Sequence, residues 1–560
     1  MTIEEIESLI NAGKFFQARL SLESRDISND SRYAQQYALA LSKTGVPEKA
    51  LSILAPFHQS NPNDPETAGI LGGIYKELFK KKRTSDLAIL SRDTYHNNFN
   101  QTKSYYKGIN AATMSAIVMQ GSKARAIAQE VISLIDPSTM DFWELATLGE
   151  AYLLTKQKDR SVAAYLSARK AAGNQWGKIT SVYNQLWLLN HYVPVSGDIL
   201  KIFHPPNVVA FVGHMIDHPN RPTKRFPPEI EANVREAIRS AIRTSNAKVG
   251  YCSLACGGDI LFAEVLEEEG GELNIMLPFD SQDFINTSIA FAGDNWQERF
   301  DKIIEKYGAS HITNLYYEGH DDLFSYLVRI IYGSAILRSS LNHTEPSLIS
   351  VLSETDLNQR TGGTRDAIKG WTFPNRHINI NPDNYLGISS SSAIAAGSSS
   401  THKATSADRP VLYMFFIQMN KELPSPVMKT LNEKLESILS GAISSPPIML
   451  DRSDKSVLIG ATSIITTMEA FHQVQSHLDE QHLEFKSSFH SGPVYLRKGT
   501  ESNTEMNTIK ELGSFGLNGY RYASQMFAAV LTLHPRKYNI EYAGSISQKN
   551  MKDIEVYLVG

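Results

Sequence analysis

The sequence predicts a multidomain protein of the α and α/β classes, in which a helical-repeat region is followed by two separate α/β regions. Three observations carry this prediction. Residues 1–195 repeat small and large apolar residues at helical spacing, residues 205–385 alternate short apolar runs with helical segments, and a serine-rich stretch separates a last α/β region from the rest. The length of 560 residues agrees with about three to four domains.

The first region, residues 1–195, has the pattern of closely packed helical hairpins. Small residues recur among large apolar ones in residues 68–75 and again in residues 145–153. The pattern resembles tetratricopeptide repeats (TPRs), which have a period near 34 residues and stack into a solenoid. Residues 105–113 also resemble the signature of the TRAFs-binding helical region of apoptosis signal-regulating kinases and bacterial multidomain proteins. The resemblance implies a protein partner, whereas ordinary helical packing is the alternative for single residues such as Tyr106.

The central region contains three short runs that are almost wholly apolar. They span residues 208–212, 273–277 and 348–352. Such runs are typical of strands that helices cover on both faces, so they predict a parallel α/β sheet. Polar or turn residues follow each run, and open α/β sheets bind ligands at the carboxyl ends of their strands. We therefore expect one ligand crevice at this edge.

Two glycine pairs in this region follow strands and precede helical segments. They are Gly257–Gly258, next to Asp259, and Gly362–Gly363, next to Thr364. A helix that starts at a glycine pair offers backbone N–H groups and its positive dipole end to an anion, which predicts a phosphate site. Alternatively, the glycines only permit tight turns between strand and helix.

The candidate ligand-binding residues lie at these turns and in the loop after the first strand. We expect Arg221 and Arg225 in that loop to contact anionic groups of the ligand, because neighbouring prolines stiffen the loop. Simple surface exposure of both arginines is the alternative. The full set is Gly213, His214, Asp217, Arg221, Arg225, Gly257, Gly258, Asp259, Pro278, Gly362, Gly363 and Thr364.

Residues 205–385 resemble the SLOG superfamily, Rossmann-like domains for nucleotide ligands that include the cytokinin-activating phosphoribohydrolases. The matching segments are residues 211–214, residues 257–264, residues 277–279 and residues 361–366. The last segment is similar to the phosphoribohydrolase loop of proline, two glycines and threonine, but Thr361 replaces the proline and Asp366 lies near the catalytic glutamate position. The resemblance implies binding of a nucleotide-type ligand such as NAD, ADP-ribose or AMP more firmly than it implies hydrolysis.

An enzyme is the alternative for this region. Cleavage of a nucleotide N-glycosidic bond, as by an NADase or a phosphoribohydrolase, needs a carboxylate that stabilises positive charge developing on the sugar. Glu264 and Asp366 are the candidate catalytic residues. Asp217 is a further acid in the region, and His214 is a candidate proton donor.

Residues 386–408 are rich in serine and poor in large apolar side chains, so we expect a flexible linker.

The last region, residues 409–560, opens and closes with apolar strands. Alternation of strands and helices between them predicts a ferredoxin-like α/β sandwich. The expected strands are residues 411–417, 457–459, 486–489 and 554–559, and the expected helices are residues 425–439 and about 520–532.

This last region resembles the catalytic domain of class III nucleotide cyclases, on residues 489–494, 514–516 and 541–544. Cyclase chemistry needs two carboxylates that hold two metal ions. In the alignment, Asp454 matches one of these carboxylates, whereas Phe416 occupies the other position, and a phenyl ring cannot ligate a hard cation. Tyr520 and Ser524 fall where the family has its transition-state asparagine and arginine. The resemblance therefore implies an inactive pseudocyclase, and an active adenylate or guanylate cyclase is the alternative under a shifted alignment.

Composition narrows the function classes further. The net charge of −4 gives no electrostatic case for nucleic acid or an anionic membrane, and no apolar run approaches the roughly 18 residues of a membrane span. The two cysteines, Cys252 and Cys256, lack matching histidine or cysteine partners for zinc and are expected to be buried thiols. We expect a cytoplasmic protein with no metal site.

Together, these features predict a regulatory or signalling protein. Its helical repeats would bind a protein partner, its central domain a nucleotide-type small molecule, and its cyclase-like domain would serve dimerisation or ligand capture in a homo-oligomer. Bacterial nucleotide signalling, stress response or phage defence is the expectation by analogy of architecture alone. A pure interaction scaffold, with both α/β domains vestigial, is the third alternative.

Overall fold

The computed structural model forms two compact units, residues 1–205 with 542–555 and residues 206–541 with 556–560. The second glycine pair, Gly362–Gly363, lies outside the described residues, as do Thr364, Asp366 and residues 387–408 of the expected linker. The described residues are 1–136, 140–173, 175–313, 317, 322–353, 370–386, 410–440, 446–496, 504–547 and 553–560.

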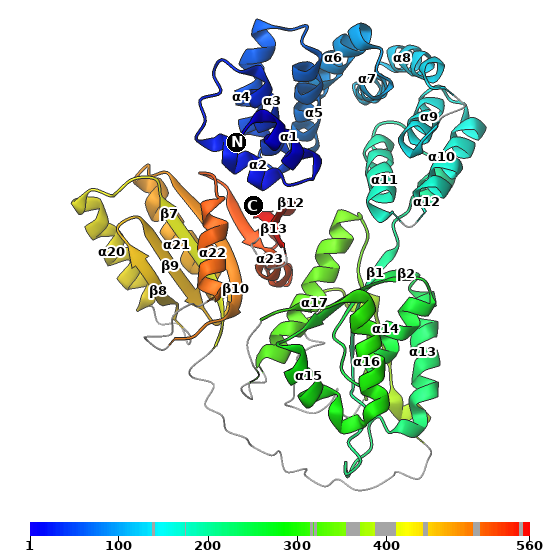
Figure 1. Cartoon of the computed structure of the whole chain (residues 1–560), viewed down its shortest axis with the longest axis vertical. Helices are drawn as coiled ribbons and strands as arrows, with labels where there is room; N and C mark the ends of the chain where they lie inside the picture. Colours follow the sequence, from blue (N-terminus) through cyan, green and yellow to red (C-terminus); the bar gives the residue numbers. More distant parts are fainter. Residues whose placement is uncertain are drawn as a thin grey trace. The chain divides into compact units, whose positions relative to one another are not determined.

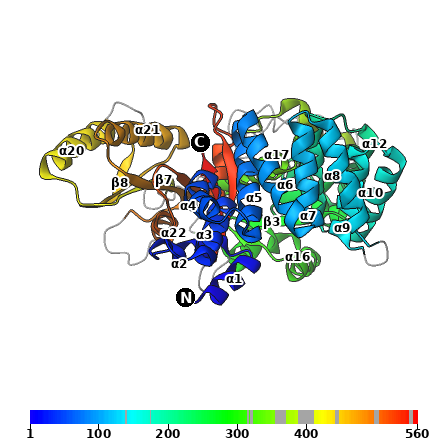
Figure 2. The same cartoon turned by 90° about the horizontal axis from the view of Figure 1, so that it is seen from above.

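Residues 1–205 fold into a succession of helices in which each packs against the next. Figure 1 shows a curved row, with α7, α9 and α11 on its inner side and α8 and α10 on its outer side, and Figure 2 shows α5 to α8 side by side. The predicted helical repeats are therefore present. The helices are α1 (Ile3–Asn11), α2 (Phe15–Glu23), α3 (Ser31–Lys43), α4 (Pro47–Ser60), α5 (Pro65–Lys82), α6 (Ser85–Thr102), α7 (Tyr105–Ile117), α8 (Gly121–Leu134), α9 (Phe142–Leu154), α10 (Lys158–Ala172), α11 (Trp176–Asn190) and α12 (Gly197–Ile202).

Small residues hold two of these hairpins together in the same way. In the α5–α6 hairpin, a Cβ added at Gly72 would lie 3.1 Å from the Tyr95 ring, and in the α9–α10 hairpin a Cβ at Gly149 would lie 2.5 Å from the Tyr165 ring. A serine on the second helix donates a hydrogen bond to the glycine carbonyl in both hairpins, over 2.9 Å to Gly72 and 2.7 Å to Gly149. The recurrent glycines in the sequence thus permit close approach of an aromatic ring.

The predicted parallel sheet begins the second unit, and its strand order is β4-β3-β2-β1-β5-β6 with every pair parallel. The three apolar runs form β1, β3 and β5, which occupy the interior of the sheet together with β2. Their side chains are buried under helices, as expected for such strands. The strands are β1 (Asn207–Gly213), β2 (Ala247–Cys252), β3 (Glu272–Leu277), β4 (Ser310–His311), β5 (Ser347–Val351) and β6 (His377–Ile380), and the α-helices are α13 (Glu231–Thr244), α14 (Gly258–Glu268), α15 (Ser281–Ser288), α16 (Asp294–Tyr307) and α17 (Asp322–Leu341), with short 3-10 turns at Pro228–Ile230, Ala290–Ala292, Pro374–Arg376 and Pro382–Tyr385.

A second sheet is mixed, with the order β12-β13-β11-β10-β7-β9-β8. Successive residues of β7 point to opposite faces: Phe415 packs with Phe471 of α21, whereas Phe416 packs in a second cluster beside α22. Helices therefore cover both faces of this sheet, and the predicted α/β character of the region is present. The elements are β7 (Val411–Met419), α20 (Ser425–Leu439), β8 (Ile448–Ser453), β9 (Ser456–Ala461), α21 (Ile464–Glu480), β10 (Phe485–Pro493), α22 (Thr504–Ser514), β11 (Arg521–Ser524), α23 (Gln525–Leu531), β12 (Ile540–Ile546) and β13 (Ile554–Val559).

One predicted helix in this region is partly wrong. The sequence pattern predicts helix throughout residues 520–532, but Arg521–Ser524 forms β11, which pairs in parallel with β10. The helix α23 begins only at Gln525. Pairing with β10 overrides the helical pattern of this short segment, because its residues gain ladder hydrogen bonds there.

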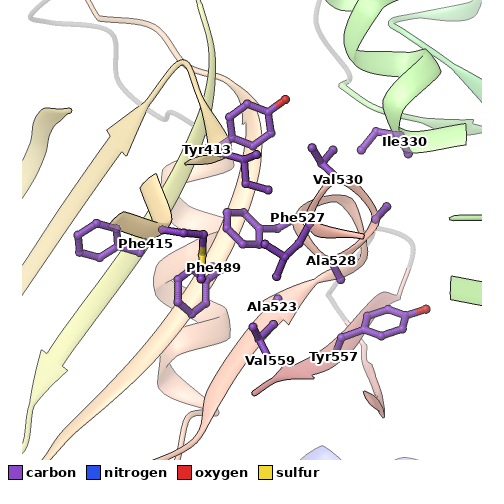
Figure 3. Close-up of a cluster of buried hydrophobic side chains, with 14 of the residues drawn as sticks. Ile330, Tyr413, Phe415, Phe489, Ala523, Phe527, Ala528, Val530, Tyr557 and Val559 are labelled. Carbon is purple, nitrogen blue, oxygen red and sulfur yellow. The ribbon is translucent and has the colours of Figure 1, made fainter. Parts of the chain in front are cut away.

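A shared apolar core joins α17 to the mixed sheet within the second unit. Figure 3 shows Ile330 of α17 facing Val530 of α23, while Phe527 of α23 points toward Phe489 of β10. Gly333 of α17 lies directly against the backbone of Ala529, so a Cβ at this glycine would overlap the Ala529 carbonyl group. Within this unit α17 packs against α23, and it also reaches the mixed sheet directly, where the Tyr326 hydroxyl donates to the carbonyl of Ser491 over 2.9 Å.

Candidate functional site

The carboxyl end of β1 is hydrogen-bonded to two neighbouring segments at the sheet edge where the sequence predicts a ligand site. The backbone N–H of His214 donates to the carbonyl of Val351 at the end of β5 over 3.0 Å. Met215 forms an antiparallel bridge with Gly257, and the N–H of Ile216 donates to the carbonyl of Cys256 over 3.0 Å. The first glycine pair thus lies beside the end of β1, as the sequence predicts for a parallel sheet.

The glycines at this edge allow close backbone packing. A Cβ at Gly213 would lie 3.1 Å from the Cα of Gly258, and a Cβ at Gly257, where φ is +106°, would lie 2.5 Å from the backbone nitrogen of Ile216. The N–H of Gly258, which the sequence predicts to face an anion, donates instead to the carbonyl of His214 over 3.0 Å. This hydrogen bond favours the alternative that the glycine pair permits a tight strand-to-helix turn.

A buried carboxyl group lies next to this turn. Asp259, in the first turn of α14, accepts a hydrogen bond from the N–H of Ala255 over 3.2 Å and is only 6% exposed. Burial raises the pKa of Asp259 to about 7, although hydrogen bonds from backbone N–H groups oppose the shift. Near neutral pH the site therefore contains a carboxyl group that changes its protonation state.

The expected proton donor His214 is also buried, and one of its ring nitrogens is hydrogen-bonded. Its Nε2 accepts a hydrogen bond from the N–H of Ser353 over 3.2 Å, which fixes the ring at the ends of β1 and β5.

Cys252 and Cys256 are buried free thiols, as predicted, and burial raises the pKa of Cys256 to about 12. A buried thiol with a raised pKa stays protonated at neutral pH, so it is poorly suited to act as a thiolate nucleophile at this edge.

The loop after β1 is fixed by Asp217 from within. Its buried carboxylate accepts hydrogen bonds from the N–H groups of Arg225 and Phe226 over 2.7 and 2.9 Å, and lies 3.4 Å from the guanidinium of Arg221. Asp217 therefore has a structural role in this loop. The Arg221 side chain remains about one-third exposed (34%) and lies on the loop surface.

Two further predicted residues are placed away from these contacts. Glu264 of α14 accepts a bidentate ion pair from Arg299 over 2.7 and 2.8 Å and a contact from Arg235 over 2.5 Å. Burial alone would raise the pKa of Glu264, but the two arginines lower it below its usual value. Because two arginines hold the Glu264 carboxylate, it is stabilised as an anion and is poorly suited to donate a proton. The other residue, Pro278, is buried after β3.

The mixed sheet contains a buried hydrogen-bonded chain where the alignment places nucleotide contacts. His490 of β10 lies between the Ser524 hydroxyl, 2.7 Å from its Nδ1, and the Glu505 carboxylate, 2.6 Å from its Nε2. Ser524 also caps α23 by accepting from the N–H of Phe527, and all three members of the chain are under 10% exposed. Phe416 is core, 6% exposed. Within the described residues, no group of three or more histidine, cysteine or carboxylate side chains is placed to hold a metal ion.

Sequence reasoning missed a polar network on the inner side of the helical repeats. Lys76 of α5 donates to the side-chain oxygens of Asn110 on α7 and Gln185 on α11, over 2.7 and 3.0 Å. Gln185 donates in turn to Glu150 of α9 over 2.8 Å, and Glu150 also accepts from the Thr113 hydroxyl. Single polar residues at helical spacing are typical of a solvated face, so the sequence carries no signal that these five residues meet.

The network requires strong curvature of the helical row. Neighbouring packed helices lie about 8–10 Å apart, so α5 and α11 would be roughly 25–30 Å apart in a flat row of four inner helices. A lysine and a glutamine cannot bridge that distance, yet Lys76 and Gln185 are bonded. Burial lowers the pKa of Lys76 to about 8 and raises the pKa of Glu150. The four inner helices α5, α7, α9 and α11 thus converge on Lys76 and Glu150, a partly buried pair of ionisable side chains.

The comparisons with known proteins support the helical region. Residues 14–115 match the family model described as Tetratricopeptide Repeats-Sensor (TPR-S), a stretch that runs from the start of α2 into α7. TPR-like repeats are thereby shown for this part of the chain, and such repeats suggest binding of a protein partner. None of the curated proteins compared with the chain matches it. No helix in the described ranges is long and apolar enough to cross a membrane.

Solved structures of two kinds are similar to parts of the chain. A thermophilic TPR protein of Thermus thermophilus is 16% identical and has a TM-score of 0.28, over 33% of this chain and 97% of its own. The guanylyl cyclase Cya2 is 14% identical with a TM-score of 0.22, over 27% of this chain and 92% of its own, and an adenylate/guanylate cyclase/hydrolase from Silicibacter pomeroyi is 14% identical with a TM-score of 0.23, over 27% and 98%. Likenesses at these values support no functional assignment.

Proposed function

We propose that the chain is a regulatory protein whose helical repeats bind a protein partner and whose parallel sheet binds a nucleotide-type ligand. The observation that carries the ligand proposal is the convergence of three segments at one sheet edge: the end of β1, the turn at Gly257 and the end of β5. Open α/β sheets bind ligands at this edge. We further propose the SLOG-like boundaries 205–385 for this domain and 409–560 for the cyclase-like one.

The contacts at this edge restrict how a ligand would be recognised. Because the N–H of Gly258 is already bonded to His214, a phosphate would gain little from the glycine pair itself. Recognition of the phosphate would therefore depend on the loop that Asp217 stabilises, in which the Arg221 side chain is partly exposed. Charge-assisted hydrogen bonds from arginine suit a phosphate or pyrophosphate group. NAD, ADP-ribose and AMP all carry such groups.

For the cyclase-like region we propose a role without catalysis. Phe416 fills the apolar cluster under α22, and Ser524 is engaged by His490 and by the cap of α23. Neither side chain can ligate a metal ion or neutralise a triphosphate in this arrangement. The domain would contribute association or ligand capture, and ATP and GTP would not be cyclised.

A second candidate function is cleavage of an N-glycosidic bond at the sheet edge. The observation that favours it is the buried Asp259, whose pKa of about 7 suits a proton donor at neutral pH. Glu264 is engaged by arginines, and Asp366 lies outside the described residues. In this variant of the proposal the same ligand is bound and then hydrolysed.

The test incubates the purified full chain with NAD, ADP-ribose, AMP and ATP and records binding by calorimetry and products by mass spectrometry. We expect binding of at least one nucleotide, with affinity about tenfold weaker after Arg221→Ala combined with Arg225→Ala, since a charged hydrogen bond contributes about 1.5–3 kcal/mol. Lys224→Ala is the matched control, because Lys224 in the same loop faces Glu229 at 3.4 Å. Absence of binding, or equal affinity in the double variant, contradicts the sheet-edge proposal. Released nicotinamide or adenine would select the hydrolytic alternative.

A further inference from the structure

We propose a binding site for a guanidinium group in a cavity among the first helices of the repeat region. The cavity has a volume of about 630 Å³ and is lined by residues of α1, α3, the end of α4 and the start of α5. Its size is within the range of about 300–1,000 Å³ that is typical of small-molecule sites. The inference goes beyond the proposed function, because it involves neither the sheet edge nor the polar network of the inner helices.

The ionisable side chains that line the cavity have an excess of negative charge. They are three carboxylates and one guanidinium, those of Glu7, Asp64, Glu66 and Arg32. Arg32 is already neutralised by Glu7, whose two carboxylate oxygens accept hydrogen bonds from its Nη2 over 2.9 and 3.0 Å. The cavity therefore disfavours a phosphate or carboxylate ligand and attracts a cation.

A buried acceptor in the cavity has no donor. The side chain of Gln35 lines the cavity and is only 5% exposed. Its Nε2 donates to the Asp64 carboxylate over 2.7 Å and to the Thr67 hydroxyl over 2.9 Å, while its Oε1 accepts no hydrogen bond from any residue that the structure describes. An unmet buried acceptor costs free energy, and an N–H group of a ligand would satisfy it.

The orientation of the Gln35 amide follows from its partners. The Thr67 hydroxyl donates its one hydrogen to Asp64, so it can only accept from the amide. Both neighbours therefore face the N–H groups of Gln35, and its carbonyl oxygen is the end offered to a ligand. Asp64 is a positioning residue, because its carboxylate is engaged by Gln35, by the Thr67 hydroxyl and by the N–H groups at the start of α5.

Glu66 supplies the negative charge that a ligand would meet. It directly precedes Thr67, to which Gln35 is bonded, and its side chain is exposed. Its carboxylate forms no ion pair within the part of the chain that the structure describes. Lys107 of α7 attracts Glu66 only from farther away and is not among the residues that line the cavity.

A guanidinium fits this set of groups better than an ammonium ion does. Its planar fork of N–H donors can serve the Gln35 carbonyl and the Glu66 carboxylate together. The half-buried ring of Phe57 also lines the cavity and provides an aromatic face on which the guanidinium can stack. The group belongs either to a small molecule or to an arginine of a protein partner.

The experiment titrates the full chain by calorimetry with two guanidinium probes, the small molecule agmatine and a blocked alanine-arginine-alanine peptide. We expect at least one of them to bind. The same peptide with citrulline, in which an uncharged urea replaces the guanidinium, should bind at least about tenfold more weakly. Tighter binding of agmatine would identify a small molecule as the source of the guanidinium, and tighter binding of the peptide would identify a protein partner.

Two variants should change the affinity in opposite directions. Glu66→Gln should weaken binding of the guanidinium probe about tenfold, because a charged hydrogen-bond acceptor is lost. Arg32→Gln should strengthen it about two- to fivefold, because the Glu7 carboxylate is released. Both side chains are exposed, so circular dichroism should show the helix content of the wild type.

Glu48→Gln is the matched control. Glu48 is the second residue of α4 after Pro47, as Glu66 is the second residue of α5 after Pro65. Glu48 is paired with Lys82 over 3.3 Å and does not line the cavity, so its replacement should leave the affinity unchanged. Lack of binding of both probes, equal affinity for the citrulline peptide, or equal affinity of Glu66→Gln and the wild type would overturn the proposal.

Discussion

Replacement of Gly333 by alanine tests the contact between α17 and α23 most directly. Alanine is the better helix former by about 1 kcal/mol, so Gly333→Ala would stabilise an exposed helix. Here the new Cβ would overlap the backbone carbonyl of Ala529, which cannot rotate away. Overpacking costs typically about 1–3 kcal/mol, and a backbone obstacle places this case at the upper end. We therefore expect a net loss of about 2 kcal/mol.

The assay must report on the second unit alone, because a chain with two units does not unfold in one two-state step. Hydrogen–deuterium exchange resolved by mass spectrometry should show faster exchange in α17 and α23 of Gly333→Ala, together with a lower urea midpoint for that transition. Gly177→Ala in α11 of the first unit is a control for adding a methyl group to a helical glycine, because nothing lies within 4 Å of its added Cβ, and it should leave the exchange of α17 and α23 unchanged. If Gly333→Ala exchanged and unfolded like the wild type, the close packing of α17 on α23 would be refuted.

Two further predictions concern buried ionisable groups. The pKa of Lys76 is lowered to about 8 in the folded chain, so between pH 8 and the unfolded value near 10.5 the unfolded chain holds a proton that the folded chain has released, and stability rises with pH. Lys76→Met should remove this rise, measured as the difference in thermal midpoint from the wild type at about pH 7.5 and about pH 9.5. The pKa of Asp259 is raised to about 7 from 3.8, so its stabilising contribution is complete below about pH 4 and is lost as the pH rises through 7. Wild type relative to Asp259→Asn should accordingly become less stable from about pH 4 to about pH 7, and a constant difference in urea midpoint would contradict the buried acid.

The elements with the strongest local patterns could be predicted from the sequence. The helix at 425–439 has the bounds of α20, and the apolar runs form β1, β3 and β5, because fully apolar runs and helical periodicity survive in most tertiary contexts. The segment around Ser524 could not be assigned correctly because strand β11 depends on pairing with β10, which lies more than thirty residues earlier. Short segments with such distant partners carry little signal of their own.

The position of the glycine turn beside β1 could be predicted from the sequence, but its hydrogen bonds could not. Gly257 and Gly258 do lie at the end of β1, yet the N–H of Gly258 is used by His214. Sequence patterns show which residues can form a tight turn, whereas the acceptor of a particular N–H depends on tertiary geometry. The same limit explains why the sequence offers Glu264 as a candidate catalytic residue: its partners Arg235 and Arg299 lie on other helices.

The hydrogen bond between Lys76 and Gln185 also bears on how the helical region can change over evolution. Ordinary solenoids gain and lose whole repeats, because each repeat contacts only its neighbours. Here the first and last of four inner helices share a bond, so an inserted or deleted hairpin between them would separate the partners and leave buried polar groups unpaired. Duplication should therefore be tolerated only outside α5–α11, and this stretch should unfold as one block instead of fraying repeat by repeat.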